Sequence, residues 1–203
     1  MKFPIIKFKP HLKWIAAIWL FFGLIVGAFS AAGIKMALIS RDPAQVVLFP
    51  FYYGFLSNLG ILVWAAGAFI PFYSSFLVRN PSERKLLRGV GILTFILLLD
   101  DFLLIHDEFF PQVLQLSGKL VYALYAIAIP IFFIRNFMLI LKATEYWILA
   151  LGSFFMGVSV LIDVHLLPGG IDVEDGFKIY GMIAYSYYWV ITSKQMVSDR
   201  LNR

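Results

Sequence analysis

Long apolar runs alternate with short polar segments along the whole chain, and this alternation predicts the architecture. About six runs approach or exceed the roughly 20 residues that an α-helix needs to cross the ~30 Å hydrocarbon core of a bilayer. Their approximate limits are residues 14–34, 53–78, 87–105, 120–141, 147–167 and 177–192. The polar segments are too short for a separate soluble domain. Residues 1–203 are therefore predicted to form one all-α domain, a polytopic transmembrane helical bundle of about six spans.

The composition agrees with a membrane protein. Of 203 residues, 61% are hydrophobic and only 14% are charged, which leaves too little polar surface for a water-soluble globule. The net charge of +5 does not indicate a nucleic-acid partner, because Lys and Arg gather in alternate loops instead of on one soluble face. Most of them precede the first run, join the second to the third and the fourth to the fifth, and follow the sixth. The positive-inside rule then predicts that both termini are cytoplasmic.

The first run could also be interpreted as a secretory signal, because basic residues precede it. Its apolar stretch, residues 14–34, is longer than the ~7–15 residues of a signal peptide. We therefore expect a retained membrane helix.

Acidic and histidine side chains interrupt this apolar background in three segments, residues 100–108, 163–165 and 172–175. In the predicted topology the third and fifth spans both run outward, and the sixth begins on the outer side. All three segments are therefore expected near the extracytoplasmic face. Ionisable groups inside a membrane are costly, and their presence indicates a functional site.

Four of these side chains are candidate metal ligands. The chain has no cysteine, so a metal would have to use imidazole and carboxylate donors, which Zn²⁺, Fe²⁺ and Mn²⁺ accept. The candidates are Asp100, His106, Asp163 and His165. Asp101 or Asp175 could act as a general base toward a water held by the metal.

The other polar residues have structural interpretations as well. Asp172 is a natural helix N-cap with Asp175 at the capping-box position, and Glu174 can pair with Lys178. Asp107 and Glu108 could be solvated loop residues. Asp100 and Asp101 could be bonded to Asn58 or to nearby hydroxyl groups.

Helical spacing leaves the role of His106 open. At about 100° per residue, Asp100 and Asp107 share one stripe of a regular helix, and His106 points well away from it. Either the helix is irregular near Pro111, or His106 belongs to a different contact. Asp107 and Glu108 also lie at a helix C-terminus, where the macrodipole disfavours negative charge, so we expect a cation, bound protons or basic partners to compensate them.

The sequence Asp100-Asp101-x4-His106-Asp107, followed by Glu174-Asp175-x2-Lys178-x2-Gly181, resembles a group of bacterial multi-pass membrane proteins with DE-x4-HE and EE-x2-K-x2-G segments. Here Asp replaces Glu at positions 101, 107 and 175. The resemblance implies a bacterial inner-membrane protein and no particular activity.

A fainter similarity is to the CREST superfamily of membrane hydrolases, whose members place a His/Asp zinc site within a helical bundle. The chain lacks their HxxxH segment and is predicted to have about six spans instead of seven. This similarity implies hydrolysis of a lipid or lipid-linked substrate.

Three classes of function follow from these patterns. The first is a metal-dependent hydrolase acting on a lipid-like substrate, and the second is a non-catalytic cation-binding or structural subunit. The third is an ion- or proton-coupled transporter, which would need polar groups through the inner half of the bundle. That half offers only scattered Ser, Thr and Tyr, although a homo-oligomer interface could supply a path.

Overall fold

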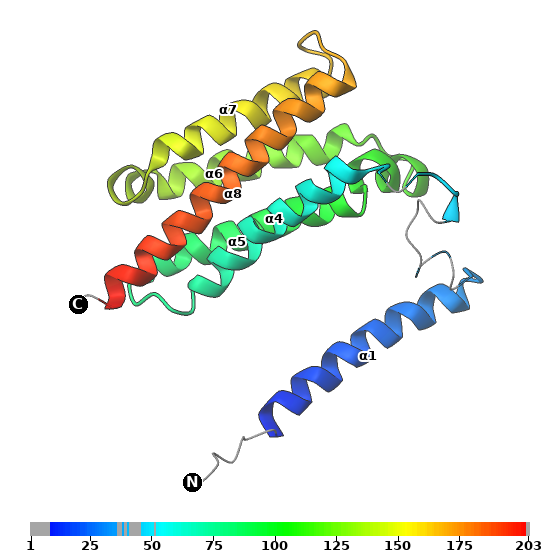
Figure 1. The fold of residues 1–203 in the computed structure, drawn as a ribbon, viewed down its shortest axis with the longest axis horizontal. Coiled ribbons are helices and arrows are strands. Elements are labelled where there is room, and N and C mark those ends of the chain that lie inside the picture. Colours follow the sequence, from blue (N-terminus) through cyan, green and yellow to red (C-terminus); the bar gives the residue numbers. More distant parts are fainter. Residues whose placement is uncertain (1–8, 36–37, 39, 41–45, 51, 202–203) are drawn as a thin grey trace. The chain divides into compact units, whose positions relative to one another are not determined.

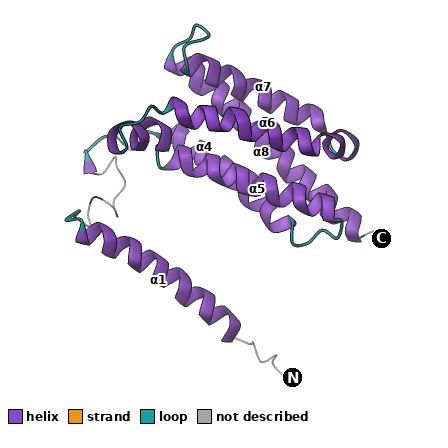
Figure 2. Cartoon of the chain, turned by 180° about the vertical axis from the view of Figure 1, so that it is seen from behind, coloured by secondary structure: helices purple, strands orange, loops and turns teal. Residues whose placement is uncertain are grey.

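The computed structural model describes the chain apart from residues 1–8, 36–37, 39, 41–45, 51 and 202–203 (Figure 1). Within the described part every regular element is a helix, and Figure 2 shows no strand there. The helices are α1 (Lys9–Ala31), α4 (Phe55–Ser74), α5 (Pro81–Phe102), the π-helix η1 (Ile105–Val113), α6 (Lys119–Ala143), α7 (Tyr146–Asp163) and α8 (Ile171–Leu201). The predicted all-α fold class is confirmed.

The described helices differ in how well they suit a bilayer. Three of them, α4, α6 and α7, are long and apolar enough to cross a membrane. A fourth span results if α5 and η1, which are bent by 61° at their junction, are counted together. The apolar part of α1 is shorter, at Trp19–Ala31. Several of the described helices are thus suited to crossing a membrane, and the count of six spans stays a prediction.

The chain forms two compact units, residues 1–55 and residues 56–203. The first unit contains α1. The second contains the remaining helices and all three acidic segments, so the candidate site belongs to the second unit.

Two helices extend well beyond the apolar runs that predict them. Helix α5 begins at Pro81 instead of near residue 87, because the Asn80 side chain accepts a 2.9 Å hydrogen bond from the Ser82 amide and Pro81 occupies the first turn. Helix α8 runs from Ile171 to Leu201, although its apolar run covers only 177–192. Hydrophobicity marks the part of a helix that suits lipid, whereas caps and packing set where the helix ends.

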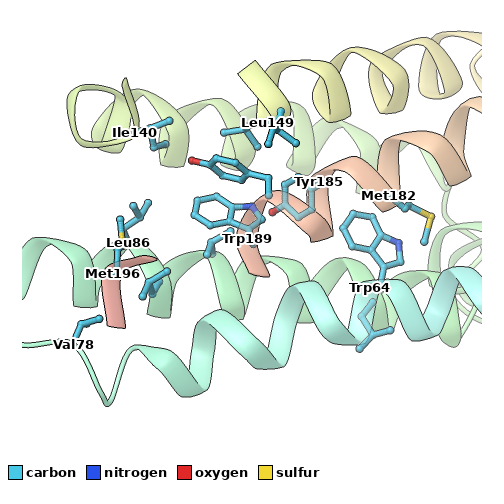
Figure 3. Close-up of a cluster of buried hydrophobic side chains, with 14 residues drawn as sticks. Trp64, Val78, Leu86, Ile140, Leu149, Met182, Tyr185, Trp189 and Met196 are labelled. Atoms are coloured by element: carbon cyan, nitrogen blue, oxygen red, sulfur yellow. The ribbon is translucent and has the colours of Figure 1, made fainter. Parts of the chain in front are cut away.

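Helix α8 is the central element of the second unit, and Figure 3 shows its side chains among those of the neighbouring helices. Tyr188 and Trp189 are fully buried. Tyr185 packs edge-on against Trp64 of α4, with ring centroids 5.4 Å apart. Trp189 stacks with Phe133 of α6 at 6.5 Å. These aromatic contacts fix the helices of the unit around α8.

Helices α7 and α8 cross at two glycines. A Cβ atom added at Gly152 would lie 2.7 Å from the Tyr185 amide nitrogen. One added at Gly181 would lie 2.7 Å from the Met156 amide nitrogen. Since both clashes are with backbone, neither can be relieved by moving a side chain, and the close approach requires glycine at both positions.

We expect Gly152→Ala to lower the thermal unfolding temperature of the detergent-purified protein, because the added methyl group forces the helices apart. Overpacking of this kind costs about 1–3 kcal/mol. The matched control is Gly157→Ala on the same helix, where an added Cβ meets nothing within 4 Å. Equal unfolding temperatures for the two variants, followed by circular dichroism, would contradict the crossing.

Candidate functional site

The candidate site begins where the third predicted span breaks. Helix α5 ends at Phe102, Leu104 adopts a left-handed conformation with φ of 50°, and η1 starts at Ile105. A left-handed leucine costs about 1–3 kcal/mol and persists only when the surroundings hold it. The helix is therefore irregular, as one of the two interpretations of His106 requires, and the irregularity begins seven residues before Pro111.

The break turns His106 back onto Asp100. The His106 amide donates to Asp100 Oδ1 at 3.1 Å, and His106 Nδ1 lies 2.9 Å from Oδ2. In a regular helix two residues six positions apart point about 120° away from each other. The Tyr125 hydroxyl of α6 lies close to Asp100, whose exposed fraction is only 5%. This buried carboxylate is held by two nitrogen atoms of His106.

The second ring nitrogen of His106 also faces a carboxylate. His106 Nε2 lies 3.2 Å from Asp107 Oδ1, and the ring packs against Tyr122 with centroids 4.8 Å apart. The contact of Nδ1 with Asp100 is a hydrogen bond, whereas the contact of Nε2 with Asp107 is an ion pair that requires a protonated ring. A doubly protonated ring has no free lone pair, so His106 would have to give up one carboxylate to bind a metal ion.

Asp101 is paired with a residue from another helix. Lys178 Nζ of α8 lies 2.5 Å from Asp101 Oδ1, and both side chains are partly buried. The sequence suggested Glu174 as the partner of Lys178, and the structure shows Asp101 in that place. Ion pairing across the bundle is stronger here than pairing along α8, because a less exposed pair is screened less.

The second and third acidic segments approach the first. The Tyr122 hydroxyl lies close to Asp163 at the end of α7. Burial raises the pKa of Glu174, and the nearby charges of Asp163, Asp175 and Asp107 raise it further, whereas Lys178 opposes them. The three segments therefore meet at one end of the unit. We call this set the charged layer; it consists of Asp100, Asp101, His106, Asp107, Asp163, Glu174, Asp175 and Lys178.

The remaining sequence candidates lie outside these contacts. Asn58 is exposed on α4, and the described partners of Asp100 and Asp101 are other residues. Glu108 is exposed and bonds to Gln112. His165 follows α7 in a left-handed conformation with φ of 64°, and its Nδ1 lies 3.4 Å from the Ile162 carbonyl oxygen.

The predicted N-cap role of Asp172 is wrong. Helix α8 already begins at Ile171, and the amides of Val173 and Glu174 donate to the Gly170 carbonyl oxygen at 3.0 and 3.1 Å. Gly170 therefore precedes the first turn, and Asp172 lies inside it. The side chain of Asp172 is outside the described part of the chain.

The described contacts bear on the predicted metal site. Among the described residues no three His, Asp or Glu side chains are grouped so that they could hold a metal ion. Of the four candidate ligands, the described contacts join Asp100 to His106 directly and connect Asp163 to His106 only through Tyr122. The metal site therefore stays a prediction.

We expect Asp101→Asn to destabilise the protein by about 1–3 kcal/mol, because it leaves the partly buried Lys178 ammonium group without its counter-charge. The double variant Asp101→Asn/Lys178→Met removes both charges and should unfold closer to the parent. Thermal unfolding of the parent, both single variants and the double variant measures the coupling. If the effects of the two single substitutions on the free energy of unfolding add strictly in the double variant, the ion pair contributes nothing to stability.

The raised pKa of Glu174 predicts a pH dependence of stability. A carboxyl group whose folded pKa lies above its unfolded pKa stabilises the fold at low pH, and this contribution is lost as the pH rises through the folded pKa. In chelator, Glu174→Gln should therefore unfold at a higher temperature than the parent near pH 8, with the advantage shrinking toward about pH 4. Glu108→Gln, exposed at the same end, is the control. A pH-independent difference would contradict the crowding of carboxylates.

Comparison with known proteins gives a family but no assigned activity. No curated protein and no solved structure matches the chain. A family model described as a domain of unknown function (DUF8692) matches residues 12–192, which include every described element of the charged layer. The chain belongs to this family.

Proposed function

We propose that the chain is an integral membrane protein, with about six spans and both termini in the cytoplasm, whose charged layer binds a divalent cation near the extracytoplasmic face. We place it in the inner membrane of a bacterium. The supporting observation is the meeting of carboxylates from η1, α7 and α8 around Glu174, where Lys178 partly opposes their charge.

The balance of charge in the layer favours a bound cation. Its carboxylates are Asp100, Asp101, Asp107, Asp163, Glu174 and Asp175, and its described basic groups are His106 and Lys178. Those two groups contact the first three carboxylates. Asp163, Glu174 and Asp175 keep their mutual repulsion, which a cation among them would replace by attraction.

The ligands that remain are oxygen atoms. Both nitrogens of His106 face carboxylates, and this disfavours a zinc site built on imidazole. Carboxylate and hydroxyl oxygens suit harder cations such as Mg²⁺ and Mn²⁺. Of Zn²⁺, Fe²⁺ and Mn²⁺, the arrangement therefore favours Mn²⁺. Asp175 and Glu174 are partly or fully exposed on the first turns of α8, so rotamer changes can bring their oxygens together around an ion.

Hydrolysis of a lipid or lipid-linked substrate is a further step beyond cation binding. It would need a base next to a water held by the cation. Asp101 is engaged by Lys178, so Asp175 is the better placed of the two predicted bases. The non-catalytic alternative, a cation-binding or structural subunit, uses the same residues without a base.

The test is binding of Mn²⁺ to the detergent-purified protein, followed by electron paramagnetic resonance. We expect about one ion per chain, and an affinity at least tenfold weaker in Asp163→Asn and in Glu174→Gln, because each variant removes a charged ligand. Glu145→Gln, which removes a carboxylate between α6 and α7, is the control and should bind as the parent does.

Equal Mn²⁺ binding in all four proteins would place the ion elsewhere. Absence of binding of Mn²⁺, Mg²⁺, Zn²⁺ and Fe²⁺ by the folded parent would contradict the proposal. In that case the charged layer would be a network of ion pairs and bound protons.

A further inference from the structure

The core-facing side of α8 carries a continuous series of polar side chains beyond the charged layer. Ser186, Trp189, Thr192 and Ser193 are all at most 3% exposed. Together with Tyr185 they recur every three to four residues, which places them on one face of the helix. In the core of an apolar helical bundle, these buried positions would ordinarily carry aliphatic side chains.

Hydroxyl groups from neighbouring helices join this stripe. Thr94 Oγ1 of α5 lies 2.9 Å from the Tyr185 hydroxyl. Thr144 Oγ1, at the end of α6, lies 2.7 Å from the Tyr188 hydroxyl. Thr144 is only half-buried, so the series approaches the surface where α6 ends. This is the end of the unit opposite the charged layer.

Four members of the stripe have hydrogen-bonding capacity to spare. In the part of the chain that is described, the side-chain polar atoms of Ser186, Trp189, Thr192 and Ser193 have no hydrogen-bond partner. Trp189 lies close to Tyr185, and Thr192 lies close to Tyr188. An unsatisfied buried polar group costs about 1–3 kcal/mol, and ordered water is the usual partner of such groups.

Helix α4 leaves room for the polar atoms of the stripe. A Cβ atom added at Gly67 would lie 2.6 Å from Ser186 Oγ. Glycine at this position therefore allows the serine hydroxyl to face α4. From Tyr185 to Ser193 the stripe covers nine residues, and the eight steps between them span about 12 Å along the helix axis.

An apolar layer separates the stripe from the charged layer. Between the Asp101–Lys178 pair and the Thr94–Tyr185 pair lie Met182 and Leu98, both buried. The separation along α8 is seven residues, or about 10 Å. Met182 faces Gly60 of α4, where an added Cβ would lie 3.0 Å from its terminal methyl carbon. An unbranched methionine opposite a glycine can change rotamer more readily than a branched side chain.

We propose that the core-facing side of α8 is a proton pathway that leads from the end of α6 at Thr144 toward the charged layer and is closed by Met182. Each hydroxyl or water oxygen accepts a proton from one neighbour and releases its own proton to the next, so no other covalent bond changes. Water at the Thr144 end is one terminus, and water on the charged-layer side of Met182 is the other. This inference does not depend on whether the charged layer binds a metal ion.

The test is proton flux into proteoliposomes that contain a pH-sensitive dye, driven by a potassium gradient with valinomycin. The closed parent should conduct little more than empty vesicles. Met182→Ala should raise the flux severalfold, because it opens the apolar layer. Met182→Gln, which keeps the volume of the side chain and adds polar atoms, should do the same, so the test does not rely on one variant folding.

A matched pair of tyrosine variants separates the pathway from a general leak. Tyr185→Phe, added to either Met182 variant, removes one hydroxyl from the stripe and should return the flux to the parent level. Tyr187→Phe removes a hydroxyl from the exposed side of the same helix and should leave the raised flux unchanged. Circular dichroism and gel filtration confirm that each variant is folded.

Two outcomes would overturn the proposal. One is a flux that stays at the parent level in both folded Met182 variants. The other is a raised flux that Tyr185→Phe and Tyr187→Phe leave equally unchanged, which would make the buried hydroxyls purely structural.

Discussion

The close crossing of α7 and α8 at Gly152 and Gly181 is the constraint on which the second unit depends. Helix α8 carries Lys178 and most of the buried hydroxyls, so it is poorly suited to lipid on its own. Burying it among more apolar helices removes those groups from the bilayer. The backbone approach at the glycines lets α7 cover one side of α8, while α4, α5 and α6 contact its other sides through Trp64, Thr94 and Phe133.

The charged layer follows from the same arrangement. Because α8 is central, its first turns lie beside the ends of α5 and α7, and Lys178 reaches Asp101. The break after α5 then adds His106, whose ring joins Asp100 to Asp107. Asp100, Asp101 and Asp107 are compensated by these contacts, whereas the charge around Glu174 is only partly opposed by Lys178. That imbalance favours a cation over a purely structural network.

Much of the fold could be predicted from the sequence, because apolar runs of roughly 20 residues have few alternatives to helices in a membrane. The grouping of acids at one end followed from alternating helix direction. The partner of Lys178 could not be predicted, since it depends on which helices are neighbours. The contact of His106 with Asp100 required a helix break at Leu104, a position that no proline or glycine marks. Of the Ser, Thr and Tyr residues that are scattered in sequence, Tyr185, Ser186, Thr192 and Ser193 share one buried face of α8.

The left-handed conformation of Leu104 has a consequence for sequence variation in this family. A β-branched residue adopts a positive φ at a higher cost than leucine does. A relative with valine or isoleucine at this position would favour continuing α5 as a regular helix, and its histidine would then point away from the carboxylate six positions before it. The shape of one exposed apolar side chain, and not only the identity of the charged residues, therefore decides whether a family member can form the bridge between its carboxylates.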